Sequence, residues 1–144
     1  MGFSLTYSSQ ALTDFDDESL LELADNSAAR NEPLGITGYL YYRDGHFIQY
    51  LEGEQKAVEE LMARIASDPR HTILSEVPLP PQPSAIFPHW YMRFLGSNLP
   101  QNQAATIEDE LAFILTTTAK DNCSKEEVAD AILQVTRRIA SLDW

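Results

Sequence analysis

Cysteine is nearly absent from this chain of 144 residues, in which Cys123 is the only one. A single thiol excludes an internal disulfide and a cysteine metal cluster, so we expect no metal site. Long apolar runs are missing as well, since no stretch approaches the roughly 20 residues that cross a bilayer. Met1–Ser4 has neither the charged nor the apolar region of a signal peptide, which predicts a cytoplasmic protein without a membrane partner.

Positive charge is also scarce. Ten Lys and Arg residues stand against 22 Asp and Glu residues, which gives a formal net charge of −12. This balance argues against a nucleic-acid backbone as the partner. The length suits one compact domain, and the 44% hydrophobic content is ordinary for a soluble globular protein.

Apolar periodicity predicts five strands and four helices. The strands are expected at Phe3–Ser9, Ile36–Tyr42, Gly45–Gly53, Thr72–Pro78 and Trp90–Leu95. The helices are expected from Asp14 to about Arg30, at Glu54–Ser67, at Gln103–Ala119, and from a capping Ser124 through Ile139. Asp44-Gly45 indicates a tight hairpin turn, and the proline-rich stretch Pro78–Pro88 an irregular loop.

The order β-α-β-β-α-β with one added strand predicts an α+β, ferredoxin-like sandwich. Its first two helices would cover one face of the sheet. The two helices near the C-terminus would then cover the other face, because a sheet with an exposed apolar face is not stable on its own.

Gln49 is an unusual residue for a strand of this kind. Alternation places it on one face with Phe47 and Leu51, while Ile48 and Tyr50 lie on the other. A buried amide without partners costs a few kcal/mol at most sites, so a polar group should meet it. The plainer alternative is a glutamine that closes a strand edge or faces solvent. Tyr7 has a similar alternative, a core tyrosine whose hydroxyl finds any acceptor.

Five segments together resemble the BLUF family, the blue-light sensors that use FAD. They are Y-S-S at Tyr7, Asn31 followed by G-I-T-G, F-I-Q-Y-L-E-G at Phe47–Gly53, D-P-R-H at Asp68–His71, and F-P-H-W-Y-M at Phe87–Met92. They follow the family's order and spacing over about two thirds of the chain. Ala85 and Ile86 depart from the pattern, since family members commonly carry an Arg just before this Phe.

The resemblance implies a flavin-binding domain at residues 1–96 and a two-helix extension at 97–144, as in short single-domain members. It places the flavin ring between the first two helices. The positions implied to bind the cofactor are Tyr7, Leu23, Ser27, Arg30, Asn31, Gln49, Arg64, Ile65, Asp68, Arg70 and His71. Leu23 and Ile65 would flank the ring, and Asn31 would bond its C4 carbonyl edge. The ribityl and phosphate contacts would lie near Arg64 and the D-P-R-H segment.

The resemblance also implies the function, which is that of a photoreceptor and not of an enzyme. Light would drive an electron from Tyr7 to FAD, with Gln49 relaying the proton and then changing its hydrogen bonds. Trp90 and Met92 match a pair that competes for the space near this glutamine, and alternation would put both on the flavin side. FMN or riboflavin could substitute for FAD. Output would pass to a separate signalling protein or through self-association into a homo-oligomer.

Other interpretations of these residues stay open. The chain could be a BLUF-like interaction module without flavin, or a small enzyme using Glu52, His46, His71 or His89, although no pair of them has a catalytic spacing. Several site positions also have ordinary structural explanations. Leu23 and Ile65 suit any core, Met92 fills gaps, Trp90 is a buried aromatic, Asn31 ends a helix in left-handed conformation, and the arginines are cations at helix C-termini.

Overall fold

A computed structural model of the chain describes residues 3–80, 82, 84–87, 89–96, 101–118 and 125–142. The strands are β1 Phe3–Ala11, β2 Thr37–Arg43, β3 His46–Gly53, β4 His71–Pro78 and β5 Arg93–Leu95. The helices are α1 Asp17–Asn31, the short 3-10 helix η1 Glu32–Leu34, α2 Gln55–Ala66, α3 Gln101–Thr118 and α4 Lys125–Ser141.

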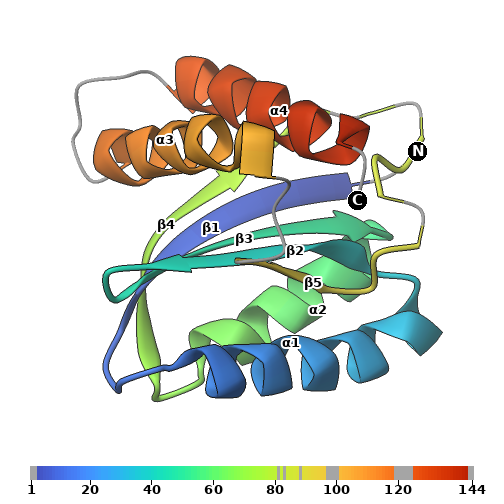
Figure 1. The fold of residues 1–144 in the computed structure, drawn as a ribbon. Helices are drawn as coiled ribbons and strands as arrows, with labels where there is room; N and C mark the ends of the chain where they lie inside the picture. The colour runs from blue at the N-terminus through green and yellow to red at the C-terminus, as the bar shows by residue number, and fades with distance from the viewer. Residues whose placement is uncertain are drawn as a thin grey trace.

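The strands form a single sheet in the order β4-β1-β3-β2-β5 (Figure 1). Neighbouring strands are antiparallel except β2 and β5, which are parallel. Helices α1 and α2 cover one face of the sheet, and α3 and α4 cover the other. This three-layer arrangement confirms the predicted ferredoxin-like α+β fold with a fifth strand. None of the helices among the described residues combines the length and the hydropathy needed to cross a membrane.

Each face of the sheet has its own hydrophobic cluster. The cluster under α1 and α2 contains Leu5, Leu51 and Met92, whereas the cluster under α3 and α4 contains Ile48 and Tyr50. The predicted alternation along β3 is therefore confirmed. The α3–α4 side shares one continuous core with the sheet. The boundary expected between residues 96 and 97 adjoins residues outside the described part of the chain, and it remains a prediction.

Local sequence explains how these elements start and turn. Asp16 caps α1 reciprocally: Asp16 Oδ1 accepts from the backbone N–H of Ser19 at 2.8 Å, and Ser19 Oγ accepts from that of Asp16 at 2.9 Å. The β2–β3 turn has positive φ at Asp44 and Gly45, 50° and 78°, as a two-residue hairpin requires. Gly38 has no room for a side chain, because a Cβ there would lie 1.7 Å from the carbonyl oxygen of Tyr50.

Several predicted ends need correction. β1 extends to Ala11, two residues beyond Ser9, and α1 begins at Asp17 rather than Asp14 because Asp16 serves as its cap. The expected strand Trp90–Leu95 is wrong for its first half, since β5 starts at Arg93. The backbone N–H of Gly38 bonds the carbonyl of Trp90 at 2.7 Å ahead of the regular β2–β5 pairing. The expected cap at Ser124 lies outside the described residues.

Candidate functional site

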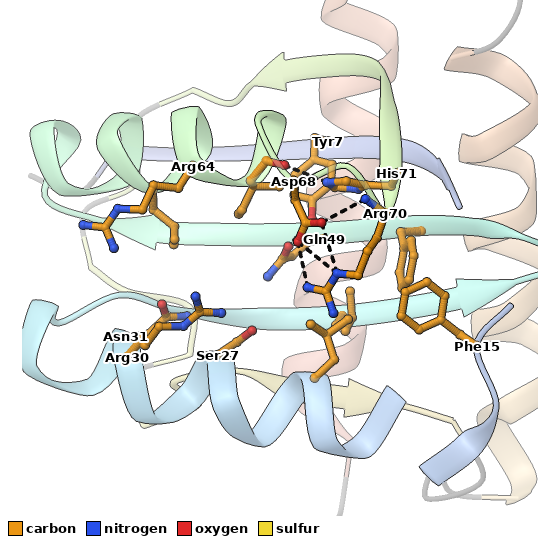
Figure 2. A pocket seen from close by; sticks show the side chains of 15 residues that line it. Tyr7, Phe15, Ser27, Arg30, Asn31, Gln49, Arg64, Asp68, Arg70 and His71 are labelled. Atoms are coloured by element: carbon orange, nitrogen blue, oxygen red, sulfur yellow. Dashed lines mark hydrogen bonds and ion pairs between the residues drawn. The ribbon is translucent and has the colours of Figure 1, made fainter. Parts of the chain in front are cut away.

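A pocket of about 700 Å³, including its open mouth, lies between α1, α2 and the sheet. Its lining residues are Tyr7, Phe15, Leu23, Ser27, Arg30, Asn31, Leu40, Phe47, Gln49, Leu61, Arg64, Ile65, Asp68, Arg70 and His71. Figure 2 shows Arg64, Arg30 and Asn31 toward one end of the pocket, and Phe15, Arg70 and His71 toward the other. The topology thus brings together residues from six elements, which are β1, α1, β2, β3, α2 and β4.

Every residue that the sequence implied as cofactor-binding lines this one pocket. Sequence reasoning missed four other lining residues, all of them apolar: Phe15, Leu40, Phe47 and Leu61. Phe47 could have been found, because it shares a strand face with Gln49. Leu40 is the cross-strand partner of Gln49, so it required the β2–β3 register, which the turn at Asp44-Gly45 sets.

The floor of the pocket carries a buried chain of hydrogen bonds. The hydroxyl of Tyr7 donates to Oε1 of Gln49, and Nε2 of Gln49 donates to the sulfur of Met92 at 3.2 Å. All three residues are nearly inaccessible, with exposures of 4%, 5% and 7%. Gln49 therefore has the two polar partners that its burial requires, and the alternative of a solvent-facing glutamine is wrong.

Burial keeps the Tyr7 phenol in its neutral form. Desolvation raises the pKa of Tyr7 well above its usual value of 10, and the nearby negative charge of Asp68 raises the pKa further. The phenolic proton therefore stays in place over the whole physiological range. It is available for donation to Gln49 throughout that range.

Asn31 connects the pocket to the segment that precedes β5. It is 1% exposed, it ends α1, and its Nδ2 donates to the carbonyl of Tyr91 at 2.8 Å. Its backbone is right-handed, with φ −78° and ψ −31°. The left-handed residue of this turn is Gly35, with φ 67°. The explanation of Asn31 as a left-handed helix end is therefore wrong.

Three guanidinium groups and one carboxylate line the pocket. Asp68 binds Arg70 through Nε and Nη2, with the shortest contact at 2.7 Å. These bonds hold the pKa of Asp68 at about 2. Within the described residues, neither Arg30 nor Arg64 forms an ion pair. The pocket lining is thus net cationic although the chain as a whole is strongly acidic.

His71 is held in a fixed orientation at the β4 side of the pocket. Its Nε2 contacts the carbonyl oxygen of Ile65 at 2.7 Å, and its Nδ1 contacts Oγ of Ser9 at 2.8 Å. A carbonyl only accepts, so Nε2 carries a proton. The ring meets that of Tyr7 edge-on, with centroids 6.1 Å apart. His71 therefore packs beside the Tyr7 ring rather than acting as an isolated surface histidine.

Trp90 was predicted on the flavin side of the sheet, but it lies on the opposite face. It packs against the cluster under α3 and α4 and stacks on Phe87, with ring centroids 4.6 Å apart. The guanidinium carbon of Arg93 lies 4.7 Å from the centre of its ring. Trp90 and Met92 are on opposite faces because residues 90–92 are not a regular strand. The sulfur of Met92 accepts a hydrogen bond from Nε2 of Gln49.

Glu52 is the residue whose role the sequence did not reveal. Its buried carboxylate accepts from the hydroxyls of Thr37 and Tyr50 at 2.9 and 2.8 Å, and from the backbone N–H groups of Ile86 and Phe87 at 2.9 and 2.6 Å. It anchors the loop after β4 to the sheet face opposite the pocket. This is the loop in which Ala85 and Ile86 depart from the family pattern.

The enzyme alternative receives no support from these positions. Glu52 is fully engaged on the far face, and His46 bonds the backbone at the hairpin. His71 lies in the pocket without either of them. No group of three or more His, Cys, Asp or Glu side chains that could hold a metal ion occurs in the part of the chain that the structure describes.

The pocket lining fits a flavin. Leu23 from α1 and Ile65 from α2 offer apolar surfaces for a planar ring, and the amides of Asn31 and Gln49 suit its polar carbonyl edge. The cationic lining suits the phosphates of the cofactor tail. One cavity thus has apolar residues suited to the ring, amides suited to its polar edge and cations suited to the anionic tail.

Residues 3–93 match the BLUF family, described as sensors of blue-light using FAD. The photoactivated adenylate cyclase subunit beta of Euglena gracilis is 38% identical over 85 residues, which are 59% of this chain and 10% of that protein. This chain therefore corresponds to about a tenth of that relative, and the cyclase activity is not carried over to it.

Two solved structures match nearly the whole chain. The dark-state structure of BlrB, a BLUF protein, is 28% identical with a TM-score of 0.71, covering 97% of this chain and 96% of that one. The photo-activated state of BlsA is 25% identical with a TM-score of 0.71, covering 99% and 97%. A sensor family agrees with the prediction that the chain is not an enzyme. Since the family match spans well over half of the chain, this protein belongs to the BLUF family of blue-light sensors that use FAD.

Proposed function

We propose that this chain is a cytoplasmic blue-light photoreceptor that binds FAD non-covalently in the pocket and uses Tyr7 and Gln49 as its light-driven switch. The observation that carries the proposal is the buried chain from Tyr7 through Gln49 to Met92 at the pocket floor. It provides an electron donor with a movable proton, an amide that can reverse its direction, and a weak acceptor behind it.

Different lining residues would contact different parts of the cofactor. Leu23 and Ile65 hold the ring, Asn31 and Gln49 meet its polar edge, and Ser27 lies on the same wall of α1 as Asn31. Arg64, Arg70 and His71 serve the ribityl and phosphate groups, with Asp68 orienting Arg70. Arg30 adds positive charge at the Asn31 end of the pocket. FMN and riboflavin share the ring and should occupy the same site.

Bound flavin, when excited by blue light, supplies a strong one-electron oxidant. Tyr7 then gives up one electron, and its phenolic proton moves to Oε1 of Gln49 along the existing hydrogen bond. Gln49 would in turn give up a proton from Nε2 to the same oxidant that takes the electron of Tyr7, so the amide would gain one proton and lose one. Return of the electron and proton restores Tyr7, and Gln49 is left rotated or as its imidic tautomer, with new hydrogen bonds at the pocket edge.

Met92 keeps the free-energy cost of this change in Gln49 low. A thioether is a weak acceptor, so the amide loses little when Nε2 turns away from the sulfur. A carboxylate or carbonyl in the same place would hold the amide far more strongly. The alternation between two amide orientations of similar free energy is what a reversible switch requires.

Output would reach another protein molecule, either a separate signalling protein or a second copy of this chain. Residues 90–95 and the C-terminal helices are the part through which the signal would leave. Tyr39 of β2, the strand that pairs with β5, bonds Thr136 of α4 with their oxygens 3.1 Å apart, so this part of the sheet has a polar connection to that layer. The support for this route is the spatial proximity of these elements.

The absorption spectrum of the purified protein, before and after blue light, tests the proposal. We expect a yellow protein whose flavin is released by acid, with bands that shift slightly to the red in light and return in the dark. A colourless preparation that also fails to take up added FAD would favour the interaction module without flavin.

A further inference from the structure

Two pocket-lining amides hold consecutive residues of the segment before β5. Nδ2 of Asn31 donates to the carbonyl of Tyr91 at 2.8 Å, and Nε2 of Gln49 donates to the sulfur of Met92 at 3.2 Å. Asn31 comes from the end of α1 and Gln49 from the middle of β3, so the two tethers reach the segment from different elements. Both side chains also line the pocket.

A third hydrogen bond to this segment does not involve the pocket. The backbone N–H of Gly38 donates to the carbonyl of Trp90 at 2.7 Å, and Gly38 does not line the cavity. The bonds that hold residues 90–92 therefore include one that is independent of the pocket and two that are made by pocket side chains. A change inside the pocket can alter the bonds made by Asn31 and Gln49 while the bond from Gly38 to Trp90 stays in place.

The planar geometry of an amide links the two ends of Asn31. Its NH2 group has two hydrogens, and its Oδ1 accepts. One N–H is directed at Tyr91, so the other N–H and Oδ1 have fixed directions relative to that bond. Any rearrangement that pulls the amide toward a partner in the pocket must stretch or turn its bond to the Tyr91 carbonyl. Since Asn31 is 1% exposed, water cannot replace that bond at low cost.

We propose that Asn31 is a positioning residue with a second role: it transmits a change in the pocket to Tyr91, in parallel with the route from Gln49 to Met92. The inference rests on the proposed function, because it requires a ligand whose carbonyl edge changes its hydrogen bonding. It adds to that function a second coupling arm, which starts at α1 and bypasses the glutamine. A purely structural tie between α1 and the segment would respond to neither ligand nor light.

Backbone hydrogen exchange of the FAD-loaded protein, in the dark and under blue light, tests the two arms. Met92→Leu removes the sulfur acceptor and keeps the size of the side chain, which leaves only the Asn31 arm. Asn31→Ala removes the other arm, and Asn26→Ala is the matched control, since Asn26 is exposed on the same helix and does not line the pocket. Absorbance is recorded on the same samples, so a missing red shift in the wild type signals failure of the proposed function itself.

We expect Met92→Leu to retain part of the light-induced change in exchange over residues 91–95. The double variant with Asn31→Ala should lose that change. In the dark, Asn31→Ala alone should speed exchange of these amides about two- to tenfold, the factor for loss of one hydrogen bond, whereas Asn26→Ala should leave it unchanged. This dark comparison can also be made without flavin.

Two results would overturn the inference. One is a normal red shift with no light-induced change left in Met92→Leu, which would assign all coupling to the Gln49 arm. The other is an unchanged Asn31 side-chain NH2 signal between dark and light in a ¹⁵N-labelled FAD-loaded protein. A light-dependent shift of that signal, together with the retained change in Met92→Leu, would support it.

Discussion

Tyr7 and Gln49 are direct cross-strand partners, paired residue to residue between β1 and β3. Paired residues in an antiparallel sheet leave the same face, so the hydroxyl of Tyr7 reaches the amide of Gln49 without help from any loop. The register of two central strands therefore builds the contact on which the proposed photochemistry depends. A slip of one residue between the two strands would put the two side chains on opposite faces of the sheet.

Removing either member of this pair should abolish the spectral response. Tyr7→Phe removes the proton and the hydroxyl but keeps the ring, and Gln49→Leu removes the amide at nearly the same volume. Both variants should bind flavin and show no reversible red shift in difference absorption spectra. Tyr39→Phe is the control, because Tyr39 is equally buried on the other face and bonds Thr136. A normal shift in Tyr7→Phe would rule out the relay.

Arg64→Ala should weaken FAD more than riboflavin. Arg64 has no ion pair among the described residues, so its whole charge is available to a phosphate. Loss of a charge-assisted hydrogen bond would cost about 1.5–3 kcal/mol, roughly 10- to 150-fold in the dissociation constant. Flavin titrations measure both ligands. Arg70→Ala should act in the same direction but less strongly, because Asp68 already binds Arg70.

Arg43→Ala provides the control for the arginine variants. Arg43 lies at the hairpin, pairs with Asp44 at 3.7 Å and does not line the pocket. It should leave both dissociation constants unchanged. If Arg64→Ala weakened riboflavin as much as FAD, Arg64 would act on the ring or on the fold rather than on the phosphate tail.

Acid should destabilise the protein partly through Asp68. Its hydrogen bonds from Arg70 hold the pKa of the carboxyl at about 2 in the folded state, below the usual unfolded value of about 3.9. A lowered folded pKa adds stability that is complete above about pH 4 and is lost as the pH falls through about 2. Since half of the Arg70 side chain is exposed, solvent limits this contribution to about 1 kcal/mol or less.

Denaturant unfolding between pH 2 and pH 5 measures this contribution. Asp68→Asn should flatten the dependence of the unfolding free energy on pH in that window. Asp25→Asn, an exposed change on α1, should leave the slope as it is. Equal slopes for Asp68→Asn and the wild type would mean that the pair contributes nothing to stability.

Glu52→Gln should cost about 2–5 kcal/mol of unfolding free energy. The carboxylate accepts four hydrogen bonds, and an amide would turn its NH2 toward two of those donors. Glu60→Gln, on the exposed side of α2, is the matched control with an expected change near zero. Chemical denaturation gives both values. A loss below about 0.5 kcal/mol would show that the loop does not depend on this anchor.

Strand alternation and segment spacing were sufficient to predict most of the site. They placed Gln49 with Phe47 and Leu51, and the family pattern placed Asn31, Arg64 and Asp68 around one cavity. Regular elements make such predictions reliable, because the period of a strand or helix fixes the direction of each side chain. Most of the pocket lining comes from six such elements that meet at one place.

Trp90 and Glu52 show where sequence reasoning failed. Trp90 was assigned by strand alternation, but the chain is irregular until Arg93, so the rule did not apply. Glu52 lies on the same face as Ile48 and Tyr50, as alternation predicts, yet its role depends on backbone N–H groups more than thirty residues away. Backbone donors carry no signature in the sequence, and a loop rich in proline gives no period from which their positions could be inferred.

Thr6 lies between Leu5 and Tyr7 on β1 and points away from the pocket. Its buried hydroxyl has no hydrogen-bond partner among the residues that the structure describes, and it lies in a small space bordered by Ile114 of α3 and Ile132 of α4. Valine has nearly the same shape as threonine. Thr6→Val would therefore remove the unpaired polar atom and should stabilise the packing of these helices on the sheet. The native threonine therefore makes the contact between the sheet and helices α3 and α4 less stable than an apolar side chain of the same shape would. A protein engineer who repaired it would gain stability and would be expected to slow any motion of the helical layer over the sheet.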